Sequence, residues 1–143
     1  MLRGISPVIS PKLMYVMMKM GHGDELVLAD GNFPTATVAQ RLIRADGLGV
    51  AQVLEAIAPL FPLDQYVDGG AFVMDPVSGD EPNPPIWQTF RQLLAASEGR
   101  PVELQRVERF AFYEQARKAY AVVATSETAI YANLILKKGV VKV

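Results

Sequence analysis

The residue best suited to proton transfer in this sequence is His22, which lies between two glycines in the segment Gly21-His22-Gly23-Asp24-Glu25. It is the only histidine of the chain, and histidine is the residue type whose ordinary pKa lies near neutrality. The flanking glycines leave its backbone free. The segment therefore suits a general acid–base group, and it equally suits a loop histidine that follows the end of a helix.

Two further clusters have side chains that could bind a ligand. Asp30 directly follows the apolar run 26–29, and α/β sheets gather ligand-binding groups at the ends of such strands. Its neighbours Gly31 and Asn32 are common turn residues, so Asp30 could instead be the carboxylate that begins a turn. Arg109 and Tyr113 are four residues apart in an expected helix, so they share a face and could bind hydroxyl groups. The alternative for this pair is an arginine that faces solvent and stacks on the tyrosine.

The segment 129–136 is expected to be the last strand of the chain. A period of two places Ile130, Ala132, Leu134 and Leu136 on one apolar face, which we expect in the core. Tyr131 and Asn133 then lie together on the opposite face. An aromatic ring beside an amide suits a polyol ligand, because the ring contacts C–H faces and the amide bonds hydroxyls.

The segment 44–49, Arg-Ala-Asp-Gly-Leu-Gly, matches part of a dinucleotide-binding fingerprint. Gln52 stands where the third glycine would be, so the match is weak. We favour a helix entry here, with Asp46 near the helix N-terminus.

Composition excludes several classes of protein and site. The 143 residues are 50% apolar and 20% charged, with 14 Lys and Arg against 15 Asp and Glu. This balance predicts one globular domain over 1–143 and no nucleic-acid partner. The absence of cysteine excludes disulfides, thiolate metal ligands and a cysteine nucleophile. A single histidine excludes poly-histidine zinc sites. The longest apolar run, 119–124, is too short for a membrane span, so we expect a cytoplasmic protein.

Apolar spacing predicts a chain in which helices alternate with strands. Helices are expected at 11–20, 50–58, 83–99 and 108–118, the first capped by Ser10 and the third by Asn83. The first helix has a methionine-rich face suited to the core or to a subunit interface. Strands are expected at 26–29, 42–43, 71–74, 102–104, 120–125 and 129–136, the last two as an antiparallel pair. This pattern predicts an α/β fold in three α/β/α layers with a mixed sheet of about five or six strands.

Together, six motifs resemble those of the fucose mutarotase/ribose pyranase family, and of its fucose branch in particular. They are G-H-G-D-E at 21–25, D-x-N-F-P at 30–34, R-A-D-G at 44–47, P-L-D-x-Y at 62–66, E-R-F-x-F-Y-E at 108–114 and Y-x-N-L-I-L-K-K-G-V at 131–140. They cover nearly the whole chain in order. Each motif is weak alone, and the set is specific.

The resemblance implies an enzyme that interconverts the α and β anomers of a free monosaccharide, here L-fucose, without metal or cofactor. It implies that His22 is the catalytic group. The residues that it implies contact the sugar are Asp30, Asp64, Arg109, Tyr113, Tyr131, Ala132 and Asn133. It further implies a ribose pyranase-like fold and a ring-shaped homo-oligomer, often a decamer.

The residue inventory fits this reaction, because mutarotation needs only proton transfers. Two alternatives remain: a non-catalytic sugar-binding or transport-accessory module, and a ribose pyranase-like activity. The spacing raises one further question. His22 and Asp30 flank an expected strand, which would hold them about 20 Å apart if the chain is straight. Either the histidine loop folds back along the strand, or His22 of one chain meets Asp30 of another, which we favour.

Overall fold

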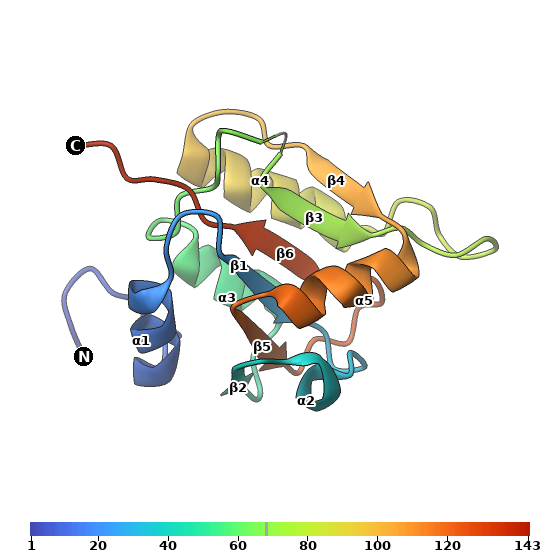
Figure 1. Ribbon diagram of the computed structural model, residues 1–143, viewed down its shortest axis with the longest axis horizontal. Helices are drawn as coiled ribbons and strands as arrows, with labels where there is room; N and C mark the ends of the chain where they lie inside the picture. The colour runs from blue at the N-terminus through green and yellow to red at the C-terminus, as the bar shows by residue number, and fades with distance from the viewer. Residues whose placement is uncertain (68) are drawn as a thin grey trace.

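The computed structural model describes residues 1–67 and 69–143 (Figure 1). Helices alternate with strands along most of the chain, as the apolar spacing predicted. The described elements are α1 (Pro11–Lys19), β1 (Glu25–Ala29), α2 (Thr35–Val38), β2 (Leu42–Ala45), α3 (Val50–Ile57), β3 (Ala71–Met74), α4 (Ile86–Glu98), β4 (Leu104–Val107), α5 (Arg109–Lys118), β5 (Ala121–Thr125) and β6 (Leu134–Lys137). The short helix α2 was not expected from the sequence.

The strands form one mixed sheet in the order β2-β5-β1-β6-β3-β4. β6 runs antiparallel to both its neighbours, β1 and β3, and the other pairings are parallel. The expected pairing of β5 with β6 is therefore wrong, because β1 lies between them. β1 is apolar on both faces and buried throughout Leu26–Ala29, so it needs a hydrogen-bonded neighbour on each side.

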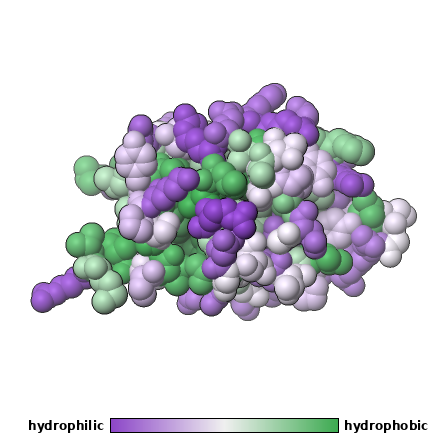
Figure 2. Space-filling model, turned by 90° about the horizontal axis from the view of Figure 1, so that it is seen from below, coloured by the Kyte–Doolittle hydropathy of each residue, from purple (hydrophilic) through white to green (hydrophobic). Residues whose placement is uncertain are grey.

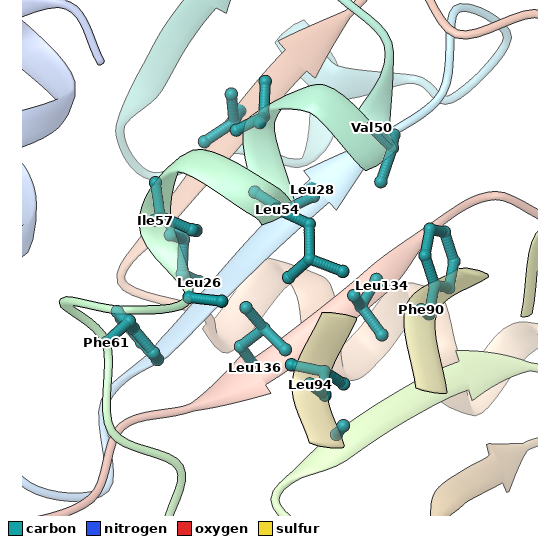
Figure 3. Close-up of a cluster of buried hydrophobic side chains, with 14 of the residues drawn as sticks. Leu26, Leu28, Val50, Leu54, Ile57, Phe61, Phe90, Leu94, Leu134 and Leu136 are labelled. Carbon is teal, nitrogen blue, oxygen red and sulfur yellow. The ribbon is translucent and has the colours of Figure 1, made fainter. Parts of the chain in front are cut away.

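Helices cover both faces of the sheet, which confirms the three-layer expectation. In Figure 1, α5 and α2 lie in front of the sheet and α3 and α4 lie behind it. Alternate residues of β1 serve the two faces: Leu26 and Leu28 pack in the core under α3 and α4, and Val27 packs with Phe112 of α5 on the other face. Figure 3 shows the first of these clusters, where Leu54 lies near Leu28.

Helix α1 begins as predicted, but its buried face is different. Ser10 Oγ accepts a hydrogen bond from the backbone N–H of Leu13 at 3.1 Å, and Pro11 occupies the first helical turn. The helix buries Leu13, Val16 and Met17, whereas Met18 is 78% exposed. The methionine-rich face is thus split between the core and the surface.

One expected helix cap is wrong, and the N-terminus of α3 is bound by a residue that the sequence did not indicate. Asn83 does not cap α4, because its side-chain oxygen accepts a hydrogen bond from Arg106 Nη2 at 2.6 Å. Asp46 pairs with Arg44 at 2.6 Å rather than with the α3 N-terminus. The α3 N-terminus is bound from a distant segment: Glu127 Oε2 accepts a hydrogen bond from the backbone N–H of Val50 at 3.1 Å.

The last strand is shorter than predicted, and the alternation fails at its beginning. Residues 129–133 precede β6 as irregular chain. Ile130, expected in the core, is 58% exposed, whereas Ala132, Leu134 and Leu136 are buried as predicted. Tyr131 has a φ of +56°, which breaks the extended conformation that the period of two requires. None of the described helices is long and apolar enough to cross a membrane.

Candidate functional site

The ends of three strands meet at one edge of the sheet. β1 ends at Ala29 and β3 ends at Met74, while β6 begins at Leu134 at the same edge because it runs antiparallel to both. The residues just outside these ends, Asp30 and Asn133, are therefore neighbours although 103 positions separate them. Crevices at such strand ends are where open α/β sheets bind ligands.

Asp30 and Asn133 hold each other by two hydrogen bonds. The backbone N–H of Asp30 donates to Asn133 Oδ1 at 2.8 Å, and Asn133 Nδ2 donates to Asp30 Oδ2 at 3.1 Å. The other carboxylate oxygen of Asp30 accepts from the backbone N–H of Asn32 at 2.9 Å. Burial raises the pKa of Asp30, and hydrogen bonds from backbone amides, that of Ala132 included, partly offset the rise.

A cavity of about 310 Å³ opens beside this pair. Such a volume lies at the lower end of small-molecule sites. The structure brings together most of the predicted contact residues here. The lining residues are Asp30, Asn32, Phe33, Met74, Val77, Asp80, Arg109, Tyr113, Ile130, Tyr131 and Asn133. Ala132 is fully buried beside the cavity.

One wall of the cavity is aromatic. The ring of Phe33 lies 5.5 Å from that of Tyr113 and 6.2 Å from that of Phe112, measured between centroids. Arg109 joins this wall from the first turn of α5, where its guanidinium lies 5.4 Å from the ring of Phe110. Arg109 is exposed, and both it and Tyr113 line the cavity. The cavity thus combines ring faces with a carboxylate, an amide, a phenol and a guanidinium, which is chemistry suited to a polyol.

His22 and Asp64 form a second group. His22 Nε2 lies 3.2 Å from Asp64 Oδ1, and the His22 ring is 5.5 Å from the ring of Tyr66. Asp64 is buried, whereas the His22 side chain is 48% exposed. The hydrogen bond from the backbone N–H of Tyr66, aided by His22, holds the pKa of Asp64 below its usual range. The group therefore presents an accessible imidazole that a buried carboxylate orients.

The two groups lie at opposite ends of β1 and β6. The backbone N–H of Gly23 donates to Lys138 O at 2.8 Å, and that of Asp64 donates to Lys137 O at 2.9 Å. Both contacts are at the carboxyl end of β6, which is the far end from Asn133. The histidine loop therefore does not fold back along β1, and the strand separates His22 from Asp30 by about 20 Å.

Several lining residues were not predicted from the sequence. Met74 could have been found, because it ends a predicted strand at the edge where Asp30 lies. Phe33 lies within the D-x-N-F-P motif. Nothing local to Val77 or Asp80 indicates that the segment between β3 and α4 reaches the cavity. Among residues 1–67 and 69–143, no group of three or more His, Cys, Asp or Glu side chains is arranged to hold a metal ion.

Comparisons with known proteins agree with this geometry. An L-fucose mutarotase of Actinobacillus pleuropneumoniae is 49% identical over 143 residues, which is 100% of this chain and 99% of that protein. The crystal structure of the fucose mutarotase of Streptococcus pneumoniae in complex with L-fucose is 48% identical, with a TM-score of 0.92, and the match covers 99% of this chain and 100% of that one.

A more distant structure, Bacillus subtilis RbsD complexed with D-ribose, shares the fold. It has a TM-score of 0.76 at 19% identity, with 99% of this chain and 100% of that chain covered. Residues 3–141 match the RbsD / FucU transport protein family. With that match and relatives near half identity over the full length, the chain belongs to the RbsD / FucU family.

Proposed function

We propose that this chain is an L-fucose mutarotase, an isomerase that interconverts the α and β anomers of the free sugar. One observation carries the proposal: carboxylate, amide, guanidinium and phenol groups converge on one cavity in a chain 48% identical to a fucose mutarotase solved with L-fucose.

The reaction requires two proton transfers and no covalent intermediate with the protein. A base takes the proton of the anomeric hydroxyl while an acid protonates the ring oxygen, and the bond between C1 and the ring oxygen breaks. The resulting aldehyde rotates about the bond to C1, and the ring closes on its other face with the reverse transfers. Positioned acid–base groups accelerate such steps by roughly 10²–10⁴-fold.

His22 is our candidate for the proton-transfer group. Its ring is accessible, and Asp64 accepts a hydrogen bond from it when Nε2 is protonated, which leaves Nδ1 to act on the sugar. Asp64 then has a supporting role in addition to any contact with the sugar.

The cavity residues would bind the remaining hydroxyl groups. Asp30 and Asn133 are already fixed by their mutual hydrogen bonds, so they offer preorganised acceptors and donors. Arg109 donates from the first turn of α5, and the rings of Tyr113 and Tyr131 offer both apolar faces and hydroxyls. Ala132 would contribute its backbone groups to the binding site.

We further propose that two subunits share each site. A monosaccharide cannot bridge the distance along β1, so His22 of one subunit would complete the cavity of another. An exposed apolar surface supports such an assembly: Figure 2 shows hydrophobic side chains gathered toward its left end, where Figure 1 places α1 and both termini. Met1, Leu2, Tyr15, Met18, Val140 and Val141 are exposed there. A decameric ring and a cytoplasmic location stay predictions.

Saturation-transfer NMR on the two anomeric protons of L-fucose tests the function. We expect the wild-type protein to transfer saturation between the anomers and His22→Ala to abolish the transfer while remaining folded. Binding without exchange by the wild type would instead indicate a sugar-binding or transport-accessory module. Faster exchange of D-ribose than of L-fucose would indicate a ribose pyranase-like activity.

A further inference from the structure

The hydroxyl of Tyr131 links the cavity to the segment between β3 and α4. It donates a hydrogen bond to Asp80 Oδ2 at 2.5 Å and accepts one from the backbone N–H of Val77 at 3.2 Å. Val77, Asp80 and Tyr131 all line the cavity. Figure 1 shows this segment extending as a long loop beyond the carboxyl end of β3. The loop residues 77–80 are thus joined to a predicted sugar contact.

The backbone of Tyr131 has an unusual conformation. Its φ of +56° lies in the left-handed region, and it is the only non-glycine residue of the described chain with a positive φ. Bulky residues rarely adopt this conformation unless the surroundings impose it. Trp87 Nε1 donates a hydrogen bond to the carbonyl of Tyr131 at 3.0 Å. The backbone is therefore held from one side while Asp80 holds the hydroxyl at the end of the ring.

Arg106 fixes the two ends of the same loop. Its Nη1 lies 3.2 Å from Asp75 Oδ1, and its Nη2 donates to Asn83 Oδ1 at 2.6 Å. Its guanidinium also lies 4.9 Å from the ring of Trp87. With both ends held by Arg106, the contact between Asp80 and Tyr131 decides where the middle of the loop meets the cavity.

The contact with Asp80 also determines whether the Tyr131 hydroxyl donates or accepts a hydrogen bond toward a ligand. A phenol has one proton to donate, and here the carboxylate of Asp80 accepts it. The hydroxyl can therefore offer only a lone pair to a ligand, so a sugar hydroxyl in contact with it must be the donor.

We propose that Asp80 is a positioning residue for sugar binding, which holds Tyr131 in its left-handed conformation with the hydroxyl as an acceptor toward the cavity. This inference rests on the proposed function, in which Tyr131 contacts the sugar. Asp80 acts through Tyr131 and does not transfer a proton. Its loss should weaken binding more than it slows the chemical step.

Two substitutions at Asp80 and one in the same loop test this role. Asp80→Ala should raise the Kd and the KM for L-fucose by roughly 3- to 10-fold with little change in kcat, because it removes a charge-assisted hydrogen bond at an exposed site. Asp80→Asn retains an acceptor for the phenol and should restore the wild-type Kd to within about twofold. Glu81→Gln removes the same charge from the neighbouring position and should bind as the wild type does, because it keeps an acceptor for the backbone N–H of Asn83, which Glu81 Oε1 binds at 2.9 Å. Trp87, the only tryptophan of the chain, donates a hydrogen bond to the carbonyl of Tyr131, so its fluorescence is a probe of changes at Tyr131 when L-fucose is titrated in.

A double-variant cycle separates a role through Tyr131 from a general effect on the loop. In the Tyr131→Phe background, Asp80→Ala should have no further effect on the Kd, because the hydroxyl it holds is gone. Equal effects of Asp80→Ala in both backgrounds would overturn the proposal, as would a Glu81→Gln protein that binds as weakly as Asp80→Ala. Wild-type protein that neither binds nor exchanges L-fucose would overturn the proposed function, and this inference with it.

Discussion

The side chain of Asn133 and residue Asp30 hydrogen bond to each other twice, and so join the end of β1 to the segment that leads into β6. Asn133 is only 5% exposed. From the strand pattern alone, Asn133 was expected to lie off the core face, where its loss would have little effect on stability. Its burial gives it a second role: it satisfies the backbone donor and a carboxylate oxygen of Asp30, which is itself only 5% exposed.

We therefore expect Asn133→Leu to lower the free energy of unfolding by about 1–3 kcal/mol, because it leaves the N–H and one carboxylate oxygen of Asp30 without partners. Sugar binding should be lost as well. Urea denaturation measures the first effect and fluorescence titration the second. Asn32→Ala is the stability control, since Asn32 is exposed in the same loop. A Leu variant as stable as the wild type would contradict this account.

Substitutions at the beginning of the last strand should differ according to the structure and not according to a period of two. Leu134→Asn puts an unpaired amide into the core and should cost several kcal/mol, about 3–5. Ile130→Asn should change stability by under about 0.5 kcal/mol, because Ile130 is exposed. Thermal unfolding followed by circular dichroism compares the two. Equal losses of stability in the two variants would instead support a continuous strand over residues 129–136.

Asp64 should make stability depend on pH in acid. A carboxyl whose pKa is lowered on folding stabilises the protein above its unfolded pKa of about 3.9, and this contribution is lost as the pH falls through the folded value. The Asp64→Asn variant has no carboxyl group at this position that could titrate. The difference in Tm between wild type and Asp64→Asn should thus be largest near neutrality and shrink below about pH 4. Glu55→Gln, at an exposed position of α3, serves as the control. A difference that stays constant from pH 7 to pH 3 would exclude this role.

Mixing inactive variants tests whether two subunits share the site. His22→Ala and Asp30→Ala should each be inactive alone, and a mixture should regain part of the activity after subunit exchange, because some interfaces then hold both intact groups. Native mass spectrometry of the mixture establishes the exchange. Proven exchange without recovered activity would place both groups in the pocket of a single chain, contrary to the separation along β1.

The sequence alone determined the features that depend on neighbouring residues. The buried strand β1, the Ser10 cap of α1 and the common face of Arg109 and Tyr113 follow from apolar spacing and local hydrogen bonding. The same holds for the three layers, because a strand that is apolar on both faces must be covered twice. The motifs also indicated most of the cavity residues.

Only the tertiary structure decided the features that join distant segments. The insertion of β1 between β5 and β6 replaced the expected hairpin, since pairing depends on the burial of whole strands and not on proximity in sequence. The loop 75–83 meets Tyr131 through Asp80, although no local pattern indicates it. Two places for His22 relative to Asp30 were compatible with the spacing of these residues in the chain. The hydrogen bond from the backbone N–H of Gly23 to Lys138 O excludes a loop that folds back along β1, because it holds the histidine loop at the far end of β6.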